Sequence, residues 1–156
     1  MLKKYTLLIF YLLVTSCGYE AIYSKKNIIN NNFSIVSLTF IGDRNVNLRV
    51  EEKLNNYRLN KQNKKISLKV VSAIKKEILV KNISGDPTSF KTTITVNVEA
   101  VTKNNIKSNI ILTESFNYKN DSNKLNLKKY EREIEKNLAE TISDKLIFKL
   151  TNIKWF

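Results

Sequence analysis

The run Val14-Thr15-Ser16-Cys17 is the segment of this sequence with a recognisable covalent chemistry. A branched apolar residue, two small residues and a cysteine form the pattern of a bacterial lipobox. Small residues fit the narrow site of the signal peptidase, the thiol accepts a diacylglycerol, and the new amino group of Cys17 can take a third acyl chain such as palmitate. Cys17 is the sole cysteine of the chain. We therefore predict that Cys17 is lipidated, because two or three acyl chains anchor a protein stably where one is marginal.

The residues before Cys17 have the organisation of a secretory signal peptide. Two lysines precede an apolar run over residues 5–14, which is too short for a membrane span of roughly 20 residues. The sequence predicts a lipoprotein signal peptide over residues 1–16; an ordinary signal peptide with an incidental cysteine and a buried first strand are the alternatives. Gly18 favours the outer membrane, because an aspartate at that position is expected to retain a lipoprotein at the inner membrane.

The composition excludes most enzyme chemistry. The chain has no histidine, one cysteine and three scattered glycines. These counts exclude histidine-based nucleophile systems, imidazole or cysteine-cluster metal sites, and glycine-rich phosphate loops. No two acidic residues are spaced as a hydrolase pair. We expect no catalytic residue, no metal site and no cofactor, and the chain is not expected to be an enzyme.

The net charge of +13 comes from 27 Lys+Arg against 14 Asp+Glu, and 23 of the basic residues are lysines. It has two interpretations: AT-rich coding bias spread over a solvated surface, or a functional patch for an anionic partner. The export signal and the presence of only four arginines argue against nucleic acid. Anionic lipid fits better, because lysine serves as a point charge for phosphates. The basic side chains gather in two segments: Lys75, Lys76, Lys81 and Lys91, and Lys119, Lys124, Lys128 and Lys129.

Hydrophobic periodicity indicates the elements that would position these lysines. Alternating apolar residues predict four strands, over residues 33–41, 66–80, 90–101 and 106–118, with a possible bulge within 72–77. A helix capped by Asp43 or Asn45 is expected after the first strand, and a long helix over residues 127–150. The expected apolar stripes of the two helices are Val46, Val50, Leu54 and Tyr57, and Leu127, Tyr130, Ile134, Leu138, Ile142, Leu146 and Leu150.

The predicted order of elements is β-α-β-β-β-α. The crossover makes the first two strands parallel, and the hairpins make the others antiparallel. The expected fold is α+β: a two-layer sandwich in which two helices cover one face of a four-stranded mixed sheet. Residues 17–32 are expected to form a lipidated tether and residues 33–156 a single domain. Both lysine segments should lie toward one end of the sheet.

In its combination of motifs the chain resembles the LptE family of outer-membrane lipopolysaccharide-assembly lipoproteins. The resemblance covers nearly the whole chain. Its carriers are Val14-Thr15-Ser16-Cys17-Gly18-Tyr19, the stretch from Asp43-Arg44 to Leu54-Asn55-Asn56, Ser84-Gly85-Asp86-Pro87-Thr88-Ser89-Phe90-Lys91-Thr92-Thr93-Ile94-Thr95-Val96, and Glu114-Ser115-Phe116-Asn117-Tyr118 before the long helix. The family often has Arg-Pro-Leu-Tyr after its Gly-aromatic start, whereas this chain has Glu20-Ala21-Ile22-Tyr23.

The resemblance implies a lipid-anchored protein of the Gram-negative outer membrane, on the periplasmic side, that plugs the lumen of an LptD β-barrel. It implies one copy per barrel and a role in assembling and inserting lipopolysaccharide. Basic residues bind lipopolysaccharide in this family, and Lys81 and Lys129 occupy the matching places; Lys91 and Lys128 beside them complete the candidate set. Two alternatives remain: a free lipoprotein that binds another anionic lipid or envelope polymer, and a structural outer-membrane lipoprotein that anchors a different complex.

Overall fold

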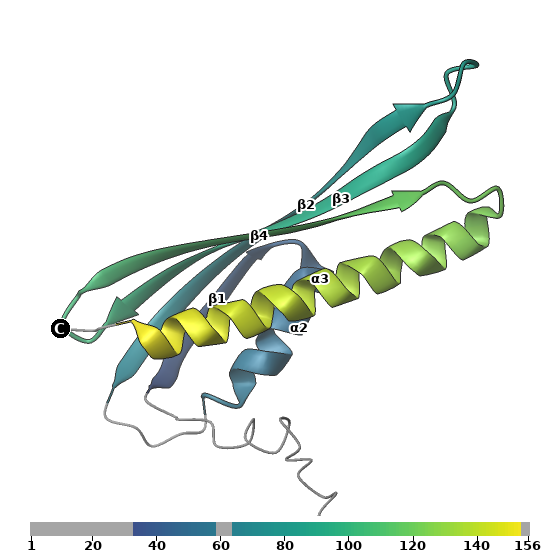
Figure 1. Ribbon diagram of the computed structural model, residues 1–156. Coiled ribbons are helices and arrows are strands. Elements are labelled where there is room, and N and C mark those ends of the chain that lie inside the picture. The colour runs from purple at the N-terminus through teal and green to yellow at the C-terminus, as the bar shows by residue number, and fades with distance from the viewer. Residues whose placement is uncertain (1–32, 59–63, 154–156) are drawn as a thin grey trace, which may run out of the picture. The chain divides into compact units, whose positions relative to one another are not determined.

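The structure, a computed structural model, describes residues 33–58 and 64–153 (Figure 1). All of these residues belong to one compact unit, Asn31–Phe156. The predicted signal peptide, Cys17 and the tether lie outside the described residues. The elements along the chain are β1 (Ser34–Gly42), α2 (Arg44–Asn55), β2 (Lys65–Lys81), β3 (Pro87–Thr102), β4 (Lys107–Lys119) and α3 (Lys124–Asn152).

The four strands form one mixed sheet in the order β1-β2-β3-β4. Strands β1 and β2 are parallel, and the β2–β3 and β3–β4 pairs are antiparallel. Both helices pack on one face of this sheet (Figure 1). The opposite face is largely polar and exposed to solvent. The predicted α+β class, element order and strand directions are confirmed.

The core lies between the sheet and the helices and follows the alternation of the strands. In β3 the side chains from Phe90 to Ala100 are buried at every second position. Helix α3 buries the predicted stripe except for Tyr130, which is 48% exposed and was wrongly assigned to the core. Helix α3 also begins earlier than expected, because the Asn123 side chain caps it by accepting hydrogen bonds from the backbone N–H groups of Leu125 and Asn126.

Strand β1 does not keep the single alternation that its sequence predicts. Phe33 and Ile35 are buried, but a register shift between Ile35 and Ser37 leaves Val36 exposed. A β-bulge inserts one unpaired residue, so the side chains after it point to the opposite face from the one that a regular strand would give them. Tyr57 was expected on the helix stripe, yet it lies just beyond α2 and stacks on Phe33 at 4.9 Å between ring centroids.

The corner between β1 and α2 is fastened to β2. Asp43 caps the helix, as predicted, because its Oδ1 accepts hydrogen bonds from the backbone N–H groups of Asn45 and Val46 at 2.9 and 3.0 Å. Gly42 precedes it with φ +100°, and a Cβ there would stand 1.9 Å from the Ser72 carbonyl oxygen. The buried Ser72 hydroxyl donates to Asn47 Oδ1 at 2.7 Å.

Strand β2 is continuous and extends beyond the end of β1. The predicted bulge within residues 72–77 is wrong, because the pairing from Ser72 to Ile78 is regular; the register shifts lie instead between Ile78 and Val80 and between Val80 and Lys81. Strand β1 ends at the register pair Gly42–Ser72, so from there on β2 has no strand on its outer side among the described residues. The far end of the sheet is therefore a three-stranded extension that ends in the β2–β3 hairpin (Figure 1).

Candidate functional site

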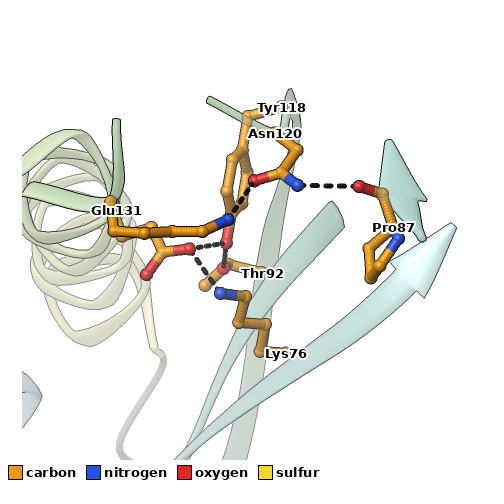
Figure 2. Close-up of polar contacts among 7 residues, drawn as sticks. Lys76, Pro87, Thr92, Tyr118, Asn120 and Glu131 are labelled. Atoms are coloured by element: carbon orange, nitrogen blue, oxygen red, sulfur yellow. Dashed lines mark hydrogen bonds and ion pairs between the residues drawn. The ribbon is translucent and has the colours of Figure 1, made fainter. Parts of the chain in front are cut away.

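The β2–β3 hairpin and the start of α3 meet at one end of the sheet, which we call the basic end: residues 75–91 and 116–132. Asn120 makes the connection between the two segments. Its backbone N–H donates to the Thr88 carbonyl at 2.9 Å. Its Nδ2 donates to the Pro87 carbonyl at 2.7 Å (Figure 2). Helix α3 begins four residues later at Lys124, whose Nζ donates to Asn120 Oδ1 at 3.5 Å. The predicted convergence of the two lysine segments is thus present.

The hairpin tip is closed by its own side chains. The Asp86 backbone N–H donates to Asn82 Oδ1 at 2.7 Å, and Asn82 Nδ2 donates to the Asp86 carboxylate at 3.3 Å. Gly85 has φ +86°, a conformation that favours glycine. The tip is therefore a defined turn between Lys81 and Pro87.

Next to the hairpin tip, a polar network joins the sheet to α3 (Figure 2). The Lys76 ammonium from β2 contacts Glu131 Oε1 from α3. Tyr118 from β4 donates its hydroxyl hydrogen to the same carboxylate oxygen at 2.9 Å, and the Thr92 hydroxyl from β3 donates to the Tyr118 oxygen at 3.4 Å. All three strands of this end, β2, β3 and β4, are thereby tied to the helix.

Three aromatic rings lie together beside this network. The Phe90 and Tyr118 rings lie 5.6 Å apart, and the Tyr130 ring meets Tyr118 edge-on at 6.1 Å. The Lys76 ammonium sits 4.3 Å from the centre of the Phe90 ring, which is a cation–π geometry. Lys76 is thus committed to Glu131 and to the rings of its own protein.

Two pKa values reflect this arrangement. Partial burial lowers the pKa of Lys76, but the hydrogen bond to Glu131 and the nearby charges outweigh it, so the net pKa is raised. Burial is the main cause that raises the pKa of the Tyr118 phenol; the Glu131 hydrogen bond adds to it, whereas Thr92 and Lys76 act in the opposite sense. Both groups are held in the protonated form that the network needs.

The remaining lysines of the basic end divide into paired and unpaired groups. Lys75 contacts the Glu77 carboxylate at 2.7 Å, and Lys91 lies opposite Glu77 in the β2–β3 register. Hydrogen bonding to Lys75, with the Lys75 and Lys91 charges, holds the pKa of Glu77 below its usual value. Within the described residues, six lysines of this end form no ion pair: Lys81, Lys91, Lys119, Lys124, Lys128 and Lys129.

The predicted candidates do not all share a face. Lys91 lies between the buried residues Phe90 and Thr92 on β3, so its side chain points away from the helices. Lys128 and Lys129 are exposed on α3, which covers the other face. Lys81 ends β2 at the base of the hairpin turn. The structure therefore places Lys81 and Lys129 at the same end of the sheet, with the sheet between Lys91 and the α3 lysines.

Sequence reasoning missed an apolar surface at the same end. Ile78, Leu79 and Val80 were predicted only as part of a strand; they are 48%, 45% and 55% exposed, and Ile83 in the turn is fully exposed. We call these four residues the apolar tip. A shallow groove of about 570 Å³ lies beside it, lined in part by Leu79, Phe116 and Tyr130. The consecutive apolar run was a visible signal, but it reads identically for a buried strand.

A second groove, of about 600 Å³, lies between the two helices. It is lined by charged side chains of both signs, among them Arg49, Arg132, Glu52 and Glu135. Burial, followed by the charges of Asp43 and Glu131, raises the pKa of Glu135. Arg49 is already paired with Glu52 at 3.3 Å. The mixed charge gives this groove no clear preference for an anion or a cation.

Two findings about metals and membranes apply to residues 33–58 and 64–153. No three acidic, histidine or cysteine side chains lie close enough together there to hold a metal ion. No helix in this part of the chain is long and apolar enough to cross a membrane.

Solved structures of bacterial lipoproteins are similar to this chain. Rare lipoprotein B from Shewanella oneidensis matches with a TM-score of 0.57 and 13% identity over 74% of this chain and 93% of that one. A minor lipoprotein from Acinetobacter baumannii matches with a TM-score of 0.55 and 13% identity over 74% and 90%. A putative lipoprotein from Caulobacter crescentus CB15 gives 0.51 and 10% over 80% and 92%. No protein-family model matches the chain, and no curated protein sequence does.

The chain has the fold of these lipoproteins. The matches span more than nine-tenths of the first and third structures and 90% of the second, so the likeness extends over whole domains and not over one shared motif. At identities of 13% or less, what is shared is the arrangement of the sheet and helices.

Proposed function

We propose that this chain is an outer-membrane lipoprotein, anchored through Cys17, that associates with an LptD-like β-barrel and assists insertion of lipopolysaccharide. The observation that carries the proposal is the fold shared with solved lipoproteins, in a chain that itself has a lipobox. The resemblance in sequence motifs to the LptE family supports the specific partner. One copy of the chain per barrel is part of the proposal.

The basic end supports the lipopolysaccharide-binding part. Lys81, Lys119, Lys128 and Lys129 form no ion pair among the described residues, so an anionic ligand does not have to break an existing contact to reach them. Lys76, by contrast, is held by Glu131. The carboxylates of Asp86 and Asp121, the acids nearest the two turns, accept hydrogen bonds from Asn82 and Asn123. Residues 75–91 and 116–132 hold nine Lys+Arg against four Asp+Glu, so the net charge of this end is positive.

The proposed mechanism is electrostatic. Lysine ammonium groups meet the phosphates of lipid A and replace the divalent cations that bridge neighbouring lipopolysaccharide molecules. These lysines are exposed, so salt screens their attraction to phosphates that lie farther away than about 8 Å at physiological ionic strength. Binding then loosens lipopolysaccharide packing at the point of insertion without a covalent step.

A direct test is lipopolysaccharide binding by the full chain in phosphatidylcholine nanodiscs. We expect saturable binding that weakens as NaCl or Mg²⁺ is raised, with empty nanodiscs as the control. Salt-independent binding, or none, would contradict the electrostatic mechanism. The same lysines favour a second candidate function, a free lipoprotein that binds another anionic lipid or envelope polymer; binding of phosphatidylglycerol in preference to lipopolysaccharide would favour it.

A further inference from the structure

The apolar tip is exposed for a local structural reason. A regular strand would turn Ile78 and Val80 to the same face and Leu79 to the other. The register shift between Ile78 and Val80 breaks this alternation, and all three side chains reach the surface. Strand β1 ends nine residues before the end of β2, at the Gly42–Ser72 pair, so β1 does not cover this edge.

The apolar tip lies next to several cations. Exposed apolar side chains that lie together, rimmed by polar residues, generally mark a binding surface. Here Lys81 follows the apolar run directly, and Lys119 on β4 lies across β3 from Val80, because Ser89 pairs with both. Neither lysine forms an ion pair within the described part of the chain. This end of the sheet thus presents exposed apolar side chains and positive charge near each other.

This juxtaposition matches the chemistry of an acylated phosphate lipid. A second copy of this chain would bring two sets of lysines together, and a neutral apolar partner would leave the lysines unused. An anionic lipid satisfies both halves, because its acyl chains cover apolar side chains while its phosphates meet the ammonium groups.

We propose that the apolar tip binds acyl chains of the same lipid whose phosphates the neighbouring lysines bind. This inference rests on the lipopolysaccharide-binding part of the proposed function. The β2–β3 hairpin then recognises the lipid by both of its parts, with Ile78, Leu79, Val80 and Ile83 on the hydrocarbon and Lys81 on the phosphate.

The test compares two ligands that share phosphates and differ in acyl chains. Lipid A and its fully deacylated bisphosphorylated disaccharide are titrated against the full chain in phosphatidylcholine nanodiscs. The variant combines Leu79→Ser with Ile83→Ser, and the matched control is Ile111→Ser, which removes an isoleucine 66% exposed on β4 outside the basic end. Circular dichroism melting confirms that each variant folds.

The expected result is a loss of affinity for lipid A of about tenfold or more in the tip variant, because two apolar contacts are removed. Affinity for the deacylated disaccharide should stay unchanged, and the control should bind both ligands like the unmodified chain. Equal binding of lipid A by the tip variant would overturn the acyl contact and leave the proposed function standing. Equal losses for both ligands would also overturn it. Failure of the unmodified chain to bind either ligand would overturn lipopolysaccharide binding itself.

Discussion

The ammonium group of Lys76 contacts the carboxylate of Glu131, and this ion pair joins β2 to the first turns of α3 across 55 residues of sequence. The two side chains are 43% and 20% exposed, and Tyr118 donates to the same carboxylate oxygen. The pair therefore belongs to a partly desolvated network that fixes where the start of the last helix sits against the sheet. The positions of the exposed lysines at the basic end therefore depend on this network.

Breaking this contact should destabilise the domain. We expect Lys76→Met and Glu131→Gln each to lower the free energy of unfolding, because each removes the charge attraction while keeping most of the packing. A double-mutant cycle in urea unfolding should give a coupling energy of about 1 kcal/mol. The matched surface pair Arg49–Glu52, at 3.3 Å within α2, should give less. Additive effects of the two substitutions would show that the network carries no stability.

Alkaline pH should weaken the fold. The pKa values of Lys76 and Tyr118 are raised above their ordinary values of 10.5 and 10.0. The folded state therefore binds more protons than the unfolded state above about pH 10, so stability is intact below that pH and falls as pH rises further. Urea unfolding between pH 8 and 11 measures this loss. Tyr118→Phe should make the fall shallower; an unchanged slope would mean that Tyr118 is not one of the groups responsible.

Reversing one charge at the basic end should weaken lipopolysaccharide binding without unfolding the protein. We expect Lys81→Glu or Lys129→Glu to reduce affinity about fivefold or more, since an ammonium–phosphate attraction becomes a repulsion. The control is Lys103→Glu, which changes an exposed lysine in the β3–β4 turn at the other end of the sheet. Lipopolysaccharide binding assays at low salt provide the measurement. If both basic-end variants bind like Lys103→Glu, the assignment of these lysines is wrong.

Two glycines with similar backbone conformations should respond differently to alanine. Gly42 and Gly85 have φ values of +100° and +86°. A Cβ at Gly42 would stand 1.9 Å from the Ser72 carbonyl oxygen, whereas a Cβ at Gly85 meets nothing within 4 Å. Gly85→Ala should cost only the conformational strain, about 1–2 kcal/mol. Gly42→Ala should cost clearly more in the same urea unfolding experiment, and equal costs would contradict the close approach of β1 to β2.

The sequence predicted those parts of the fold that local patterns determine. The alternation from Phe90 to Ala100, the Asp43 cap and most of the α3 stripe are local signals, and the structure confirms them. Tyr130 was assigned to the apolar stripe and is exposed, and the run from Ile78 to Val80, predicted as part of a strand, is exposed as well. Their exposure depends on where other elements end and on a bulge, and neither is encoded in the apolar residues themselves.

The candidate site was predictable in position but not in detail. The clustering of lysines in two segments placed the basic end correctly. Which lysines are committed to internal contacts could not be predicted, because Lys76 meets Glu131 only through the folded chain. The apolar tip was missed for the same reason: a short apolar run has the same sequence pattern whether it is buried or offered to a ligand.

Co-purification tests the proposed function most directly. The tagged full chain is extracted from membranes in mild detergent, purified, and the proteins that remain bound are identified by mass spectrometry. The proposal predicts an LptD-like outer-membrane β-barrel in a 1:1 ratio with the chain, retained by the unmodified protein and by the Lys103→Glu control alike. A folded, lipidated chain that purifies without any β-barrel would contradict it.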